Sequence, residues 1–289
     1  MLLYTFAWIG CSVAYVPFLT VLLPARVDQL AEGEAVRWLA YISFTGAIAA
    51  SVANIGFGWL SDVLRSRRSV AGTGMVLTCG LLITTGTVES LPALLAVIAC
   101  WQLALNMMLS PIAAWAGDCV PDHQKGRLGG LLSMAPAAGA MAGILVTTPG
   151  LVADQERLWI VALMVAVCVL PALFFASPRP FPGLMTSPLA CNGDQPPARV
   201  FSKSAARMWV ARLLIQIIEV ALFSYLFLWL RSLSGTVSDN DTAWVFSAAL
   251  VIGIPLAMMA GRWADRQNRP IAPLGVSAVF TSLGLLIMA

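Results

Sequence analysis

The sequence predicts an all-α fold, a polytopic transmembrane helical bundle, and three properties of the chain support this prediction. Of its 289 residues, 59% are hydrophobic and only 11% are charged, whereas a soluble domain carries about 25% charged residues. The mean hydropathy is +0.84, so the chain has more apolar surface than a soluble fold of this size would bury. Apolar runs of about 20 residues, the length that crosses a bilayer as a helix, recur along the whole chain.

Nine apolar runs are long enough to be membrane spans. The first has no basic segment before it and exceeds the length of a signal-peptide core, so we expect it to remain as a span. Most connections are short, but the one after the sixth run holds six prolines and has the composition of a linker. The predicted spans are residues 2–24, 38–60, 70–88, 92–117, 127–149, 157–176, 208–230, 243–261 and 271–289.

The proline-rich connection divides the chain into three predicted parts. Residues 1–176 form an N-terminal bundle of six helices, 177–207 a cytoplasmic linker, and 208–289 a partial C-terminal bundle of three helices. The last apolar run continues to Ala289 without a polar cap. We therefore expect further helices beyond it in the complete gene.

The charged residues of the loops predict the orientation. Lys and Arg gather in the even-numbered loops, whereas Asp28, Asp154, Glu156, Asp239 and Asp241 lie in odd-numbered loops. Because cytoplasmic loops carry an excess of Lys and Arg, the N-terminus and the even loops are expected in the cytoplasm. We expect an integral protein of a bacterial inner (plasma) membrane.

A short motif occurs twice, after the second and after the eighth span. Each copy places an aspartate four residues after a glycine, followed by basic residues, at the cytoplasmic end of its span. Its recurrence after the second span of each half indicates two parallel repeats related by an axis along the membrane normal. The copies comprise Gly58, Asp62, Arg67 and Arg68, and Gly261, Asp265, Arg266 and Arg269.

These motifs resemble the loop signature of the major facilitator superfamily. The first copy departs from it with Val63 for an arginine and Arg65 for the second glycine, and the second copy has Asn268 in that glycine position. A third match follows span four, where Asp118 and Arg127 resemble another motif of the superfamily. The resemblance implies two six-helix repeats with the second truncated, at about nine of twelve helices.

The resemblance also implies a role for the motif residues. Asp62, Arg67 and Asp118 would stabilise the outward-facing state through charged contacts that break when the cytoplasmic gate moves. The alternative is that the basic residues only anchor the loops at anionic lipid headgroups, as membrane orientation alone would require.

Span seven carries the one acidic residue that lies deep within a predicted span. Glu219 is 12 residues from both Arg207 and Arg231, which places it near the middle of the bilayer. A carboxylate there costs several kcal/mol unless it is protonated, paired or hydrated, and such a group suits proton coupling. Arg212, Gln216 and Glu219 share one helix face by their spacing, which we expect to line a central cavity. A structural Glu–Gln network is the alternative.

Three weaker candidates lie in other spans. Gln102 and Asn106 are four residues apart near the middle of span four, where hydrogen bonding between helices explains them about as well as substrate contact does. Tyr15 lies beside Pro17 in span one, and a proline kinks a helix. We expect Tyr15 near the substrate.

The predicted function is secondary active transport of a small organic solute by alternating access, either facilitative or coupled to protons as symport. A drug–proton antiporter is an alternative, because Ala135–Gly143 partly resembles an element of such antiporters. A non-transporting remnant or sensor with the same fold is another. Membrane lipids are the expected surroundings.

Other function classes lack their motifs. His123 is the only histidine, and neither H-E-x-x-H, G-x-S-x-G nor a Walker A sequence occurs, so we expect no enzyme, metal site or cofactor. The net charge of +3 argues against a nucleic-acid partner.

Overall fold

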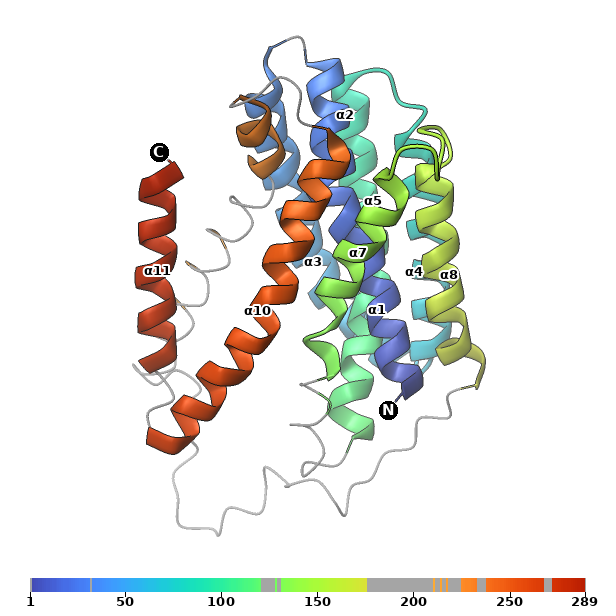
Figure 1. Cartoon of the computed structure of the whole chain (residues 1–289). Coiled ribbons are helices and arrows are strands. Elements are labelled where there is room, and N and C mark those ends of the chain that lie inside the picture. The colour runs from blue at the N-terminus through green and yellow to red at the C-terminus, as the bar shows by residue number, and fades with distance from the viewer. Residues whose placement is uncertain are drawn as a thin grey trace.

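The chain folds as a bundle of long helices (Figure 1). The computed structural model describes residues 2–31, 33–120, 128, 131–175, 210, 214, 217, 225–232, 238–267 and 272–288. All regular secondary structure in these segments is helical. The predicted all-α transmembrane class is therefore confirmed.

Every long helix overlaps a predicted span. Among the described residues, four helices are long and apolar enough to cross a membrane by themselves, namely Leu2–Leu30, Ala35–Val63, Leu91–Trp115 and Arg157–Phe175. Residues 225–232 are also helical and overlap the end of the seventh predicted span, whereas the predicted linker lies outside the described residues. The elements are α1 (Leu2–Pro17), η1 (Phe18–Leu22), α2 (Leu23–Leu30), α3 (Ala35–Val63), α4 (Arg67–Thr85), α5 (Leu91–Cys119), α7 (Ala135–Thr147), α8 (Arg157–Phe175), α10 (Asp239–Gln267) and α11 (Ala272–Met288).

The helix of the fifth predicted span is interrupted. Within residues 127–149, Ser133 and Met134 form a turn and α7 begins at Ala135. Pro136 explains the break, because proline lacks an N–H and is tolerated only in the first turn of a helix.

The first span is a single bent helix with a widened turn at its centre. Phe18–Leu22 is π-helical, and the N–H of Leu23 donates to the carbonyl of Phe18. Pro17 and Pro24 stand on either side of this turn, and each lacks the N–H that an α-helical ladder needs. The hydroxyl of Thr20 donates to the carbonyl of Val16 at 2.7 Å. Such π turns are frequent at functional sites.

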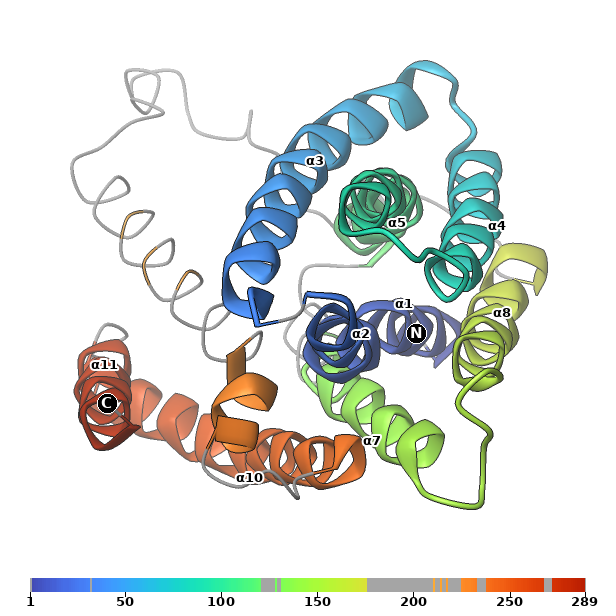
Figure 2. The same ribbon diagram turned by 90° about the horizontal axis from the view of Figure 1, so that it is seen from above.

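The helices of the N-terminal part pack into one unit. Seen from above in Figure 2, α5 lies between α3 and α4, and α1 packs against α7 and α8. Trp101 of α5 is fully buried and meets the ring of Phe18 edge to face, with 4.8 Å between the ring centroids. An aromatic pair of this kind adds about 1 kcal/mol to the burial of its area. The core of this half therefore ties α5 to the π-helical turn.

Gly74 sets the distance between α4 and α5. A Cβ atom built at this position would lie 2.5 Å from the backbone nitrogen of Met108, well inside contact distance. Small residues allow helix backbones to approach closely, which is how membrane helices gain packing energy without a hydrophobic driving force. The glycine is thus required for the α4–α5 contact.

We call helices α1 to α8 the N-terminal half and the described residues from 225 onward the C-terminal half. Among the described residues, the two halves contact each other at one end. Helix α10 begins beside α7 and contacts η1, and it then runs away from the other helices toward α11 (Figures 1 and 2). We call the end of the bundle where α2 ends and α10 begins the distal end. The opposite end, which carries the N-terminus, is the proximal end.

The close approach at Gly74 generates a stability prediction. Gly74→Ala should lower the unfolding temperature in detergent by several degrees, because the methyl group forces α4 from α5 at a cost of about 2 kcal/mol. Gly80→Ala is the matched control on the same helix, since nothing lies within 4 Å of its Cβ position. An equal effect of both changes on thermal unfolding would contradict the packing account.

Candidate functional site

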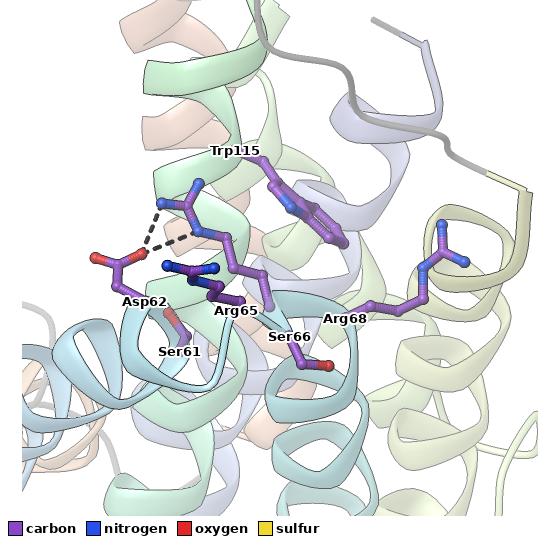
Figure 3. Close-up of a pocket in the computed structure, with 7 residues that line it drawn as sticks. Ser61, Asp62, Arg65, Ser66, Arg68 and Trp115 are labelled. Carbon is purple, nitrogen blue, oxygen red and sulfur yellow. Dashed lines mark hydrogen bonds and ion pairs between the residues drawn. The ribbon is translucent and has the colours of Figure 1, made fainter.

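The first copy of the repeated motif forms a basic hollow at the proximal end. Arg67 donates twice to one oxygen of Asp62, from Nη2 at 2.7 Å and from Nε at 3.2 Å. The arginine side chain is 22% exposed and the aspartate 60%. A hollow of about 420 Å³ surrounds them, and Figure 3 shows its residues, which are Ser61, Asp62, Arg65, Ser66, Arg67, Arg68 and Trp115.

Two residues fix the backbone around this hollow. Arg65 ends the turn between α3 and α4 with a left-handed φ of +49°. Gly58 lies one turn before Asp62, where a Cβ would come within 2.9 Å of the hydroxyl of Ser110 on α5. A glycine at this point lets α3 rest on α5, and α5 in turn supports the hollow through the buried ring of Trp115.

Polar side chains of α3 and α5 meet near the middle of the bundle. Asn54 donates its amide to Asn106 at 3.3 Å, and Asn106 donates to the carbonyl of Gln102 at 2.9 Å. The hydroxyl of Ser110 donates to the carbonyl of Asn54 at 3.0 Å. These bonds form a polar row that links α3 and α5, with Asn106 buried and Asn54 exposed. In this arrangement Asn106 acts first as a link between helices.

Apolar residues join the two halves beside the π-helical turn. Val16 and Ala140 from the N-terminal half and Phe246 from α10 form a buried cluster, each at most 4% exposed. Tyr15, Leu226 and Leu250 pack against it. We call these six residues the interhalf cluster. Tyr15 therefore lies at the boundary between the halves, two residues before Pro17, the proline that precedes the widened turn.

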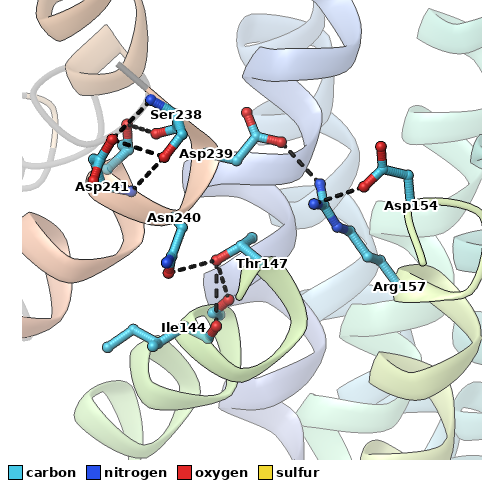
Figure 4. Close-up of polar contacts among 10 residues, drawn as sticks. Ile144, Thr147, Asp154, Arg157, Ser238, Asp239, Asn240 and Asp241 are labelled. Atoms are coloured by element: carbon cyan, nitrogen blue, oxygen red, sulfur yellow. Dashed lines mark hydrogen bonds and ion pairs between the residues drawn. The ribbon is translucent and has the colours of Figure 1, made fainter. Parts of the chain in front are cut away.

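Charged residues join the halves at the distal end, nearer the rim. Figure 4 shows Arg157 of α8 bound to Asp239 of α10 at 2.9 Å and to Asp154 at 2.7 Å. Arg231 pairs with Asp28 of α2 and lies over the ring of Phe227. We call the Arg157–Asp239 and Arg231–Asp28 contacts the distal ion pairs.

The start of α10 is held in place for these contacts. Ser238 and Asp241 exchange bonds in a capping box: the N–H and hydroxyl of Ser238 donate to the Asp241 carboxylate, and the N–H of Asp241 donates to the Ser238 hydroxyl. The two bonds from Ser238 lower the pKa of Asp241 below its ordinary value. The hydroxyl of Thr147 meets Asn240 at 3.5 Å (Figure 4). Asp239 is thereby placed opposite Arg157.

The family model described as Major Facilitator Superfamily matches residues 1–289. The chain belongs to this superfamily. Multidrug resistance protein MdtG of Citrobacter koseri is 26% identical over 301 residues, which cover 98% of this chain and 71% of the relative. The resemblance inferred from the loop motifs is confirmed.

A solved structure has the same fold. The crystal structure of a bacterial homologue of the human lysosomal transporter Spinster, in an inward-facing and unoccupied conformation, superposes with a TM-score of 0.64 at 15% identity. The match covers 92% of this chain and 61% of that one. The chain thus spans about six-tenths of the length of this neighbour.

The predicted site residues fall into three groups. Asp62, Arg67 and Arg68 line the proximal hollow, and Gly58 lies one turn before Asp62. Asn106 lies in the polar row, which Gln102 joins through its backbone carbonyl, while Tyr15 lies at the interhalf cluster. Helix α10 carries Gly261, Asp265 and Arg266 of the second motif near its proximal end, and α5 carries Asp118. The residues or side chains outside the described part are Asp118, Arg127, Arg212, Gln216, Glu219, Gly261, Asp265, Arg266 and Arg269.

The distal ion pairs were not among the predicted site residues. Their charges contributed only to the predicted orientation of the chain. The sequence nevertheless contains an indication of these contacts, because Arg157 and Arg231 are basic residues in odd-numbered loops that are otherwise acidic. Charges of opposite sign on one membrane face, from both halves, are candidates for a contact between them.

Arg65 occupies the position where the superfamily motif has glycine, and its backbone adopts a glycine-like conformation. A non-glycine residue with this φ is strained by roughly 1 kcal/mol or more. Arg65→Gly should therefore raise the unfolding temperature, Arg65→Asn should raise it less, and Arg65→Val should lower it. Thermal unfolding of the purified variants in detergent measures this order.

Arg68→Gly is the control for the loss of an arginine from the same hollow. Residue 68 is in the first turn of α4, so glycine there should destabilise the helix by up to about 1 kcal/mol. If Arg65→Gly destabilises the protein as Arg68→Gly does, the left-handed backbone at residue 65 is not a source of strain.

Proposed function

We propose that the protein is a secondary transporter that moves a small organic solute by alternating access between its two halves. The observation that carries the proposal is the contact at one end. Among the described residues, the interhalf cluster and the distal ion pairs join the halves toward the distal end, whereas α10 diverges from the N-terminal helices toward its proximal end (Figure 1). Alternating access requires halves that meet at one end at a time.

The orientation of the proposed cycle comes from the loop charges. The proximal end carries the basic motif with Arg65, Arg67 and Arg68, and basic loops face the cytoplasm. In this orientation the described arrangement is closed to the outside and open to the cytoplasm. The Spinster homologue that shares the fold is likewise described as inward-facing.

The solute would bind between the halves near the middle of the membrane. The polar row of Gln102 and Asn106 supplies amide groups from one side, and Tyr15 lies at the boundary below the distal contacts. We include Arg212, Gln216 and Glu219 from the seventh span in the same site because their spacing puts them on one face. Opening the interhalf cluster would then expose this site to the outside.

The proposed role of the motif is to hold the proximal end closed when the protein is in its outward-facing state. Asp62 now binds Arg67 within its own half and is 60% exposed, so its carboxylate is accessible to a partner. When the proximal ends of the two halves close, groups of the C-terminal half approach Asp62, and these groups are its proposed partners. Asp118, Arg127, Gly261, Asp265, Arg266 and Arg269 belong to the same proposed gate.

Transport in proteoliposomes tests whether Glu219 couples solute movement to protons. Purified protein in proteoliposomes should accumulate its solute when a pH gradient is imposed. Glu219→Gln should abolish uphill accumulation while leaving exchange of solute across the membrane, because an amide cannot carry a proton. Accumulation at the wild-type rate by the variant would remove Glu219 from the coupling mechanism.

Glu156→Gln is the matched control for this experiment. It removes one carboxylate from an exposed loop position and should leave both accumulation and exchange unchanged. The absence of any solute movement, with or without a gradient, would instead favour a non-transporting sensor with the same fold.

Drug–proton antiport is the second candidate function. It is supported by the likeness to MdtG, which is named a multidrug resistance protein. Small residues along α7, with Ala140 in the interhalf cluster and Gly139 against the backbone of Ser12, also resemble an element of drug antiporters. Cells that express the protein should then extrude a lipophilic cationic dye, and loss of the gene should sensitise them to such cations.

A further inference from the structure

Arg157 contacts one carboxylate from each half at the distal end. Its Nη1 atom lies 2.9 Å from Asp239 of α10, and its Nη2 atom lies 2.7 Å from Asp154 (Figure 4). Asp154 is three residues before Arg157, in the loop that leads into α8. It therefore moves with the N-terminal half, whereas Asp239 moves with the other.

The two carboxylates differ in their surroundings. The Arg157 side chain is only 16% exposed, and its Nε atom has no partner among the described residues. Asp154 is 85% exposed and Asp239 is 29% exposed. A largely buried guanidinium is strongly destabilising without a counter-charge, so the arginine needs one carboxylate in every state of the protein.

The geometry points to an exchange of partners at Arg157 during opening, an inference that rests on the proposed alternating access. With the distal end closed, Arg157 binds both carboxylates. With the distal end open, it keeps Asp154 alone. Asp154 thereby lowers the free-energy cost of separating the halves, and Asp239 raises it.

This mechanism predicts opposite effects from two carboxylates on one arginine. Asp239→Asn weakens the bond across the halves and should increase the fraction of protein open at the distal end at least threefold. Asp154→Asn leaves Arg157 without a counter-charge after opening and should decrease that fraction at least threefold. If the two contacts of Arg157 served only to hold the loop before α8 in place, both substitutions would shift the open fraction in the same direction.

The open fraction is measured from distances between spin labels in the full chain in nanodiscs. Leu151 and Trp244 are exposed positions on the two sides of the distal contact, so both are replaced by labelled cysteines after removal of the natural cysteines. Double electron–electron resonance then gives the closed and open populations. Asp154→Ser replaces Asp154→Asn if the amide variant does not fold.

Glu156→Gln is the control, because none of the ion pairs among the described residues includes Glu156. It should leave the distance distribution unchanged. Shifts of Asp154→Asn and Asp239→Asn in one direction, or no shift from either, would overturn the exchange at Arg157 but not alternating access. A single, unchanging distal distance in every variant, at neutral and at acidic pH, would instead overturn the proposed function.

Discussion

The contact between the two halves at the distal end is the interaction on which the rest of the structure depends. Buried apolar residues around Val16 and Phe246 join the halves beside the bend of the first span, and the ion pairs of Arg157 and Arg231 join them nearer the rim. The Arg157–Asp239 pair is largely shielded from water, with side chains 16% and 29% exposed, so it is screened less than a fully exposed pair. A contact that combines apolar packing with ion pairs can hold the halves together. It can also open along the one surface where the halves meet.

The N-terminal half supplies the rigid body that such a contact requires. Gly74 brings α4 onto the backbone of α5, Gly58 brings α3 onto Ser110, and the buried Trp101 ties α5 to Phe18 of the first span. Close-packed interiors transmit displacement instead of absorbing it. A movement at the distal end is therefore carried to the basic hollow around Asp62.

Much of this architecture could be predicted from the sequence, and the reason is the bilayer. Since every backbone polar group in lipid must be satisfied within the chain, apolar runs had to be helices, and α3 and α8 begin and end within three residues of their predicted spans. Local backbone chemistry was harder to predict. Pro136 shortens α7, and the prolines around Phe18–Leu22 produce a π turn in place of a simple kink. The pairing of Arg157 with Asp239 depends on how the two halves dock, which periodicity and composition do not encode.

The central claim is that transport requires the halves to separate at the distal end. Asp28→Cys and Arg231→Cys, in a chain without other cysteines, place one thiol on each side of that contact, and a short bifunctional methanethiosulfonate can connect them. The account predicts that the cross-linked protein in proteoliposomes loses solute transport and that a reductant restores it, with either single-cysteine variant unaffected by the reagent. Undiminished transport by the fully cross-linked protein would contradict it.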